Sequence, residues 1–166
     1  MDTLQVFTVL QSNLWQPHQT IVLPIDLLKY YEIKTYPFSA VVNLDHSTGA
    51  GTHWIAIFLE DCSPDYIPDY FCSFNSDVPE AIREFFRKNC GENGVVRVTK
   101  LPFQQAEAKS CGLWAIEFII HRSWGLSTKD YISRFSRDTV SNERILRSRW
   151  TGDDADSLRF KYNDFR

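Results

Sequence analysis

The central element of the fold is predicted by residues 110–121, which read SCGLWAIEFIIH. After its first three residues the stretch is almost entirely apolar, as expected of a helix buried in a core. Cys111 stands at the first turn of this helix, where unpaired backbone N–H groups and the helix dipole favour a thiolate. The same N–H groups can hold the oxyanion of a tetrahedral acyl intermediate. The stretch therefore predicts a central helix with a nucleophilic cysteine at its start.

A cysteine nucleophile needs a base and a second oxyanion donor, and both residue types lie upstream. His53 begins a strand-like run over residues 53–59, which makes it the best candidate for the base. Gln104 and Gln105 precede Cys111 by seven and six positions, and either carboxamide can supply the donor. Taken alone, each of these residues also fits a structural role, since free cysteine often packs as a small apolar side chain. Their order favours a cysteine hydrolase.

The remaining elements predict an α+β domain. Strands are expected over residues 39–44, 53–59, 69–74 and 94–99, and helices over 25–31, 79–87, 111–121, 127–135 and 142–150. Elements in this order form a central mixed β-sheet of about four to five strands flanked by helices. We expect one domain over residues 1–150. The polar segment 151–166 is either a frayed tail or an arm docked by Leu158, Phe160, Tyr162 and Phe165.

Composition permits this fold without selecting a function. The chain has 166 residues, 43% hydrophobic and 14% aromatic, so it can bury a core. Its four cysteines are irregularly spaced, with no CxxC pair and no secretory signal. We therefore expect reduced thiols, with Cys62 and Cys90 as bystanders, no metal site and an intracellular protein that is not secreted. No apolar stretch has the length of a membrane span, so no membrane association is expected.

The charge of the chain is unevenly distributed. Residues 1–78 carry −7 and residues 79–166 carry +4, which together give the net charge of −3. Basic residues outnumber acidic ones most clearly in the segment 122–149. This basic segment is compatible with weak binding to nucleic acid or an acidic partner, and equally with a solvated helical surface.

Three motifs together resemble the adenovirus protease (adenain) family of cysteine peptidases. They are GTHWIAI at residues 51–57, YFCSFN at residues 70–75, and Gln104 followed by SCGLW at residues 110–114. The chain looks most like the relatives encoded by Polinton/Maverick elements and adintovirus-type viruses, over residues 35–146. The wider clan includes the proteases of ubiquitin-like proteins. The resemblance implies a papain-like arrangement with the nucleophile at the N-terminus of the central helix.

The resemblance assigns a role to each matching position. Cys111 is the nucleophile and His53 the general base. Gln104 has the adenain-like offset of the oxyanion donor, whereas Gln105 fits the spacing of the ubiquitin-like deconjugases. Trp54 forms a wall of the cleft beside the base, and Gln105 and Gly112 are also placed in the cleft.

The third catalytic position departs from the family pattern. Relatives carry an Asp or Glu where this chain has Cys72, and a thiol is a weak hydrogen-bond partner for the histidine. One explanation is a Cys111–His53 dyad, because cysteine is the nucleophile that depends least on a strong base. Another is loss of proteolysis. A third is that a nearby group takes over the orienting task, the candidates being Asn75, Asp69 and Asp77.

The sequence favours a viral-type cysteine endopeptidase that processes precursor or structural proteins by acyl transfer, as in virion maturation. The alternatives are a deconjugating protease for ubiquitin-like modifiers and a catalytically impaired binding module. The resemblance implies a protein or peptide substrate with glycine near the scissile bond. It also implies no required cofactor, activation by a peptide or DNA, and action in the host nucleus, the cytoplasm or the virion. We expect a monomer.

Overall fold

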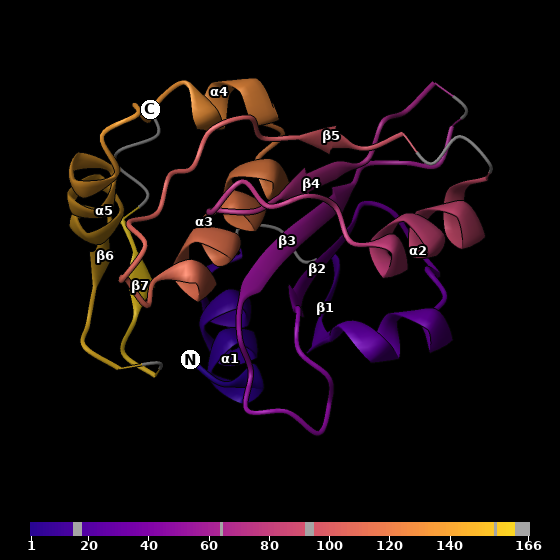
Figure 1. Cartoon of the computed structure of the whole chain (residues 1–166), viewed down its shortest axis with the longest axis horizontal. Helices are drawn as coiled ribbons and strands as arrows, with labels where there is room; N and C mark the ends of the chain where they lie inside the picture. Colours follow the sequence, from indigo (N-terminus) through magenta and orange to yellow (C-terminus); the bar gives the residue numbers. More distant parts are fainter. Residues whose placement is uncertain (15–17, 64, 92–94, 155, 162–166) are drawn as a thin grey trace.

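The computed structural model describes residues 1–14, 18–63, 65–91, 95–154 and 156–161 (Figure 1). The helices are α1 (Thr3–Asn13), the 3-10 helix η1 (Ile25–Tyr30), α2 (Glu80–Cys90), α3 (Cys111–Ser123), α4 (Thr128–Ile132) and α5 (Thr139–Ser148). The strands are β1 (Gln19–Pro24), β2 (Phe38–Asn43), β3 (Trp54–Leu59), β4 (Asp69–Phe71), β5 (Arg97–Val98), β6 (Trp150–Thr151) and β7 (Arg159–Phe160). Within the described residues, no helix is long and apolar enough to span a membrane.

Five strands form a mixed sheet in the order β1-β2-β3-β4-β5. The outer pairs β1–β2 and β4–β5 are parallel, while β2–β3 and β3–β4 are antiparallel. Every residue of β2 and β3 is buried, as expected for strands that are covered on both faces. The prediction of an α+β fold with a mixed sheet of four to five strands is confirmed.

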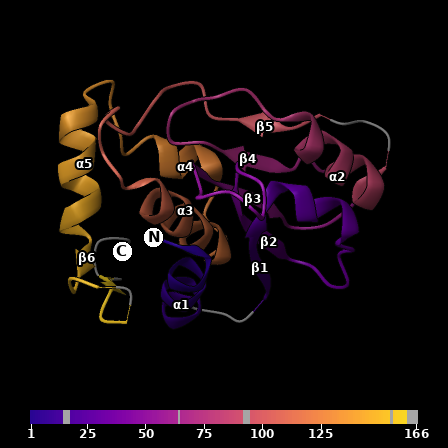
Figure 2. The same cartoon turned by 60° about the horizontal axis from the view of Figure 1, so that its bottom comes forward.

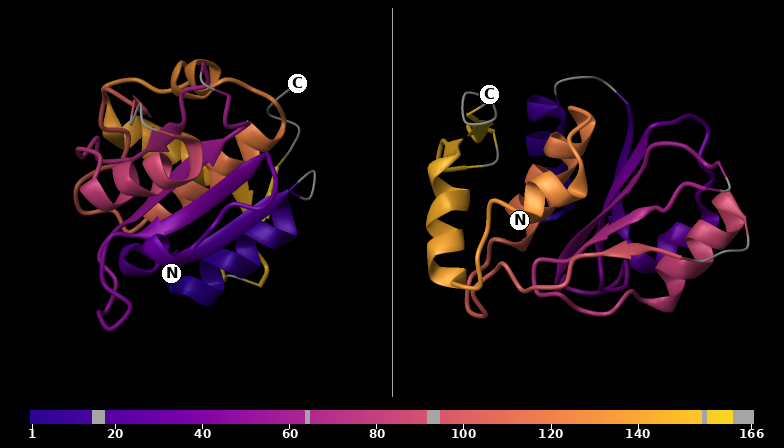
Figure 3. Two further views of the ribbon diagram at one scale, coloured as in Figure 1. Left: turned by 90° about the vertical axis from the view of Figure 1, so that its right-hand side faces the viewer. Right: turned by 90° about the horizontal axis from the view of Figure 1, so that it is seen from above.

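Helices cover both faces of the sheet, and each face has its own core (Figures 2 and 3). Because successive side chains of a strand point to opposite faces, Ala56 and Phe58 of β3 pack in the core that contains α1 and α3. Ile55 and Ile57 pack in the core that contains α2 and η1. Helix α5 and the β6–β7 hairpin lie outside α3, on the side away from the sheet.

Helix α3 is the centre of the larger core, as residues 110–121 predicted. Every residue from Gly112 to Arg122 is buried. Glu117 is the acidic residue among them, and burial raises its pKa to about 7 although Arg149 and Trp150 oppose the shift. Its carboxylate accepts hydrogen bonds from Arg149 Nη1 at 2.6 Å and Trp150 Nε1 at 3.1 Å, which ties α3 to the end of α5.

Two N-terminal elements were not predicted. Helix α1 begins with a capping box, in which Asp2 accepts from the Gln5 N–H and the Gln5 side chain accepts from the Asp2 N–H. Its apolar residues do not define a single face, since Leu4 and Phe7 are exposed while the opposite side is buried. The edge strand β1 is half-buried throughout and lacks the alternation that signals a strand.

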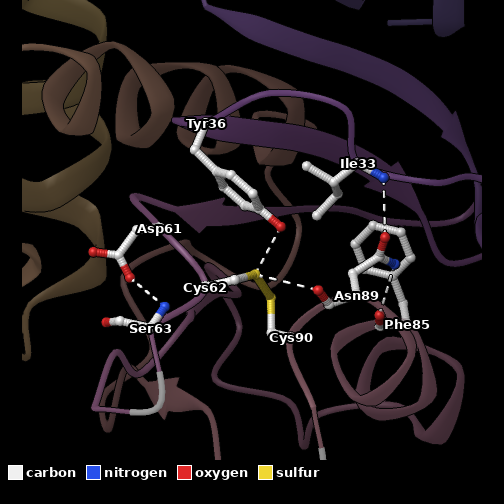
Figure 4. Close-up of a disulfide and its surroundings, with 8 residues drawn as sticks. All are labelled: Ile33, Tyr36, Asp61, Cys62, Ser63, Phe85, Asn89 and Cys90. Atoms are coloured by element: carbon white, nitrogen blue, oxygen red, sulfur yellow. Dashed lines mark hydrogen bonds between the residues drawn. A yellow bond between two sulfur atoms is a disulfide. The ribbon is translucent and has the colours of Figure 1, made fainter.

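The expectation of four reduced thiols is wrong for Cys62 and Cys90, which form a disulfide (Figure 4). Cys62 lies in the connection after β3 and Cys90 ends α2, and their Cα atoms are 4.9 Å apart. The Tyr36 hydroxyl donates to the Cys62 sulfur at 2.7 Å. Their separation of 28 residues gives no local signal, because the pair forms only once α2 packs on the sheet. Cys72 and Cys111 are free.

The described part of the C-terminal segment forms the short β6–β7 hairpin and lies against α1. Phe160 is buried, and its N–H donates to Asn13 Oδ1 at 2.7 Å. Leu158 packs against the same core. The other proposed anchors, Tyr162 and Phe165, lie outside the described residues.

Candidate active site

The candidate nucleophile borders a cavity at the N-terminus of α3. Cys111 is the first residue of the helix and is half-buried. It lines a cavity of about 690 Å³ together with Trp54, Phe74 and Gln104. The same cavity borders the first residues of the chain and the loop between β2 and β3. Segments that are far apart in sequence therefore meet at the proposed sulfur nucleophile.

The start of α3 is anchored by a carboxylate from α5. Ser110 occupies the N-cap position, but its side chain makes no cap hydrogen bond. Its hydroxyl instead donates to Glu143, with distances of 2.7 and 2.9 Å to the two carboxylate oxygens. The indole Nε1 of Trp114 donates to the same group at 3.1 Å. The N–H groups of the first turn therefore have no side-chain cap, as an oxyanion site requires.

The candidate base is held from two sides. His53 directly precedes β3, and its ring packs on Phe74 with a centroid distance of 4.7 Å. Its Nε2 lies 3.3 Å from Cys72 Sγ. The other ring nitrogen, Nδ1, is buried and has no hydrogen-bond partner among the described residues. Burial lowers the pKa of His53 to about 4, so the imidazole is neutral at neutral pH and able to accept a proton.

The segments that carry the nucleophile and the base are in contact. A Cβ atom at Gly112, the residue after Cys111, would lie 3.5 Å from Cδ1 of Trp54, the residue after His53. The same atom would lie 3.3 Å from Met1 Sδ, and the Trp54 indole donates to the Met1 carbonyl at 3.0 Å. The absence of a side chain at Gly112 therefore allows the start of α3 to pack closely beside Trp54.

Cys72 fills the position where the resemblance to the adenain family implies a carboxylate. It follows β4, is buried, and its sulfur also accepts from the Ser76 N–H at 3.4 Å. The Ser76 N–H and His53 Nε2 therefore both face this sulfur. Burial and the neighbouring Cys72 raise the pKa of Tyr70, whose hydroxyl donates to the Asp77 carbonyl at 3.4 Å.

The other candidates for the orienting role have different partners. Asp69 is fully buried and its carboxylate forms ion pairs with Arg97 Nη1 at 2.8 Å and Arg122 Nε at 3.2 Å. Asn75 is exposed, with φ of 59°, and its backbone N–H donates to the Cys72 carbonyl at 3.0 Å. Asp69 therefore links β4 to β5 and α3 through its ion pairs. Asn75 stabilises the turn after Cys72.

Gln104 is the glutamine that borders the cavity with Cys111. Its Oε1 accepts a hydrogen bond from the Ser73 hydroxyl at 2.7 Å, and its Nε2 donates to the Ala108 carbonyl. Gln105 is half-exposed, and its main-chain carbonyl accepts from the Ala108 N–H at 3.0 Å. The geometry therefore favours the residue with the seven-position offset as the oxyanion donor.

Sequence reasoning missed three supporting residues, namely Ser73, Phe74 and Glu143. Ser73 and Phe74 directly follow the position of the family's acid, so the YFCSFN motif contained a signal for them. Glu143 is 33 positions from Ser110, and no local pattern connects the two. Its role depends on how α5 packs beside α3.

The basic segment 122–149 is not one solvated surface. Arg122 is buried against Asp69, and its guanidinium lies 4.6 Å from the Phe58 ring centroid. Arg149 is buried against Glu117. Two of its basic side chains therefore neutralise buried carboxylates, which leaves fewer of them to face a nucleic acid.

Comparison with known proteins gives distant matches to viral cysteine proteases. No protein-family model matches the chain. It is 26% identical over 136 residues to the SUMO-1 cysteine protease S273R of African swine fever virus (isolate Warthog/Namibia/Wart80/1980), covering 78% of this chain and 44% of that protein. The protein of the same name from isolate Pig/Kenya/KEN-50/1950 is 28% identical over 103 residues, covering 58% and 37%. The chain thus spans less than half the length of these relatives.

The crystal structure of the African swine fever virus pS273R protease has a similar fold. The TM-score is 0.52 at 18% sequence identity, over 88% of this chain and 62% of that one. At this identity the match concerns the fold alone. It agrees with the central sheet and flanking helices described above.

Proposed function

We propose that the chain is a cysteine protease domain that hydrolyses an acyl bond through Cys111, His53 and Gln104. The sequence relatives support this proposal, because they are cysteine proteases. The observation that carries it is that Cys111 and Gln104 line one cavity with Thr52 and Trp54, the two sequence neighbours of His53, whose neutral imidazole contacts Cys72. The chemistry proposed uses side chains, backbone N–H groups and water, with no metal or organic cofactor.

In the proposed mechanism, His53 Nδ1 takes the proton from Cys111 Sγ and the thiolate attacks the substrate carbonyl carbon. The oxyanion is held by first-turn N–H groups of α3 and by the carboxamide of Gln104. The imidazolium then protonates the leaving amine, and a thioester remains on Cys111. Water that is deprotonated by His53 hydrolyses this thioester and regenerates the free thiol.

Cys72 supports this mechanism by fixing the orientation of the imidazole. Its sulfur accepts from the Ser76 N–H, and in the tautomer that we propose His53 Nε2–H is the second donor to this sulfur. A proton on Nε2 leaves the lone pair on Nδ1, the nitrogen without a partner among the described residues. The family's carboxylate is then replaced by a weaker, uncharged acceptor, and the enzyme works as a Cys111–His53 dyad oriented by Cys72.

For the substrate we propose the C-terminal tail of a ubiquitin-like modifier. Two of the sequence relatives are named SUMO-1 cysteine protease. These names favour a protease that removes ubiquitin-like modifiers over the endopeptidase for precursor proteins that the sequence analysis favoured. A protein substrate with an extended tail also suits a cavity that runs from Cys111 past Trp54 to the β2–β3 loop. Endopeptidase action on a glycine-containing peptide is the competing outcome of the test.

The test compares two substrates and two labelling experiments. Wild-type protein, Cys111→Ala and His53→Ala are incubated with a SUMO fusion and with a short glycine-containing peptide, and cleavage is followed by mass spectrometry. We expect cleavage of the fusion after the modifier's tail, and none with either variant. Iodoacetamide labelling mapped by mass spectrometry should modify Cys111 before the buried Cys72, and His53→Ala should slow labelling of Cys111. Labelling of Cys111 that is indifferent to His53, with no cleavage, would instead indicate a binding module.

We also propose that activation by DNA, which the family resemblance implies, is weak or absent. The basic side chains of the segment 122–149 outside the two buried ion pairs are Lys129, Arg134, Arg137, Arg144 and Arg147. Adding duplex DNA to the cleavage assay at low and high salt tests the proposal. A rate increase at low salt that disappears at high salt would contradict it, because phosphate contacts weaken steeply with salt.

A further inference from the structure

The side chain of Gln104 has a single orientation that its neighbours define. The Ala108 carbonyl can only accept, so the carboxamide nitrogen must face it. The opposite end of the carboxamide then presents Oε1, which accepts from the Ser73 hydroxyl at 2.7 Å. Ser73 is 1% exposed and Gln104 is 3% exposed, so water does not replace this hydrogen bond readily. Both contacts therefore assign the same positions to the oxygen and the nitrogen of the carboxamide.

The backbone of Ser73 also holds the segment that carries Gln104. The Ser73 carbonyl accepts from the Phe103 N–H at 2.8 Å and from the Gln104 N–H at 3.1 Å. Ser73 follows β4, which pairs with β3 through Phe71 and Ala56. Gln104 is therefore fixed relative to the strand that follows His53, although it lies in an irregular segment.

We infer that Ser73 is a positioning residue for the oxyanion donor, an inference that rests on the proposed function. The Nε2 group has two N–H bonds, and one is used by the Ala108 carbonyl. With Oε1 held by Ser73, the second N–H is available to the substrate oxyanion in the cavity that Gln104 shares with Cys111. A reversed carboxamide would place an oxygen lone pair against that negative charge. Ser73 therefore acts on the rate of acyl transfer without touching the substrate.

A double-mutant cycle tests this inference. Ser73→Ala should lower kcat about tenfold with little change in KM, because the oxyanion forms only in the transition state. Gln104→Ala should lower kcat by about 10²–10³-fold. In the Gln104→Ala background, Ser73→Ala should have no further effect, since its influence passes through that side chain. The matched control is Ser148→Ala, which removes an exposed hydroxyl that bonds only within α5.

Alkylation of Cys111 separates positioning of Gln104 from general damage to the site. The rate of iodoacetamide labelling depends on the thiolate and its base, and no oxyanion forms in that reaction. We expect iodoacetamide to label Cys111 of the Ser73→Ala variant at the wild-type rate. The inference would be overturned if Ser73→Ala kept the wild-type kcat, or if its Cys111 labelling rate fell as much as its kcat. It would also be overturned if the effects of Ser73→Ala and Gln104→Ala on kcat were fully additive.

A second readout does not depend on turnover. In ¹⁵N-edited NMR spectra, the carboxamide signals of Gln104 are assigned by their loss in Gln104→Ala. We expect these N–H protons to exchange with solvent at least tenfold faster in Ser73→Ala, because the bond that orders the amide is gone. Unchanged exchange would refute the positioning role. Faster exchange in Ser73→Ala, together with a wild-type protein that cleaves neither substrate, would instead mean that the positioning is right and the proposed function is wrong.

Discussion

His53 Nε2 lies 3.3 Å from the sulfur of Cys72, at the position where the resemblance to the adenain family implies a carboxylate. The contact orients the imidazole without adding a negative charge. Burial therefore dominates the electrostatics of the ring and lowers the pKa of His53 to about 4. The proposed base therefore stays neutral in mild acid, but lacks the charge that would stabilise the imidazolium of the proposed reaction.

Cys72→Asp should restore a negative charge beside the imidazole and so oppose the effect of burial on the pKa of His53. A carboxylate near Nε2 favours the protonated ring, so the pKa of His53 should rise by at least about one unit. Since the neutral ring accepts the thiol proton, the acidic limb of kcat/KM should move to higher pH by the same amount. Profiles measured from pH 4 to 8 for the wild type, Cys72→Asp and Cys72→Ala will test this prediction. Coincident acidic limbs for the wild type and Cys72→Asp would show that Cys72 does not contact the base.

Removal of the Glu143 carboxylate should loosen the start of α3. In Glu143→Ala the buried Ser110 hydroxyl and Trp114 indole lose their acceptor, which should cost about 1–3 kcal/mol in the free energy of unfolding. Urea denaturation measures the change. Glu84→Ala, which removes an exposed carboxylate from α2, is the control and should stay within about 0.5 kcal/mol of the wild type.

The Cys62–Cys90 disulfide should stabilise the chain by restricting its unfolded state. For a loop of this length the chain-entropy estimate is about 3.6 kcal/mol. Unfolding of the wild type in urea should therefore shift to lower concentration when a phosphine reductant is added. The Cys62→Ala/Cys90→Ala variant should show the lower midpoint with or without reductant. Equal midpoints for oxidised and reduced wild type would contradict the prediction.

Glu117 should make stability fall as pH rises toward neutrality. Its folded pKa of about 7 exceeds the ordinary value of 4.5, so the folded state binds more protons between these two values. Stability from this group is fully present below pH 4.5 and is lost as pH rises through 7. Glu117→Gln removes the titration, so the free energy of unfolding of the wild type relative to this variant should decrease from pH 4.5 to 7. A constant difference would mean that Arg149 keeps Glu117 ionised throughout.

The elements of this fold that could be predicted from the sequence were the two at its centre, α3 and β3. The stretch 110–121 is apolar on all sides and β3 is a continuous apolar run, so both could be identified from composition and length alone. Helix α1 escaped because its exposed Leu4 and Phe7 blur the helical periodicity. The disulfide escaped because Cys62 and Cys90 meet only through the packing of α2.

The same division applies to the candidate site. Cys111 and His53 were predicted from their place in the sequence, and Gln104 from the family resemblance; the structure places the three in adjoining segments. The residue that contacts the imidazole could not be predicted, since Asp69 and Cys72 are close to each other in sequence and either one could have reached His53. Only the ion pairs of Asp69 with two arginines show that its carboxylate is committed elsewhere.

Two consecutive residues after β4 contact two side chains of the candidate site. Cys72 contacts the imidazole and Ser73 contacts the carboxamide, at the point where β4 passes into the turn that the Asn75 N–H and the Cys72 carbonyl close. An insertion or deletion of one residue ahead of them would displace both side chains and remove both contacts together. Mutagenesis libraries and loop grafts in this region should therefore preserve length before identity.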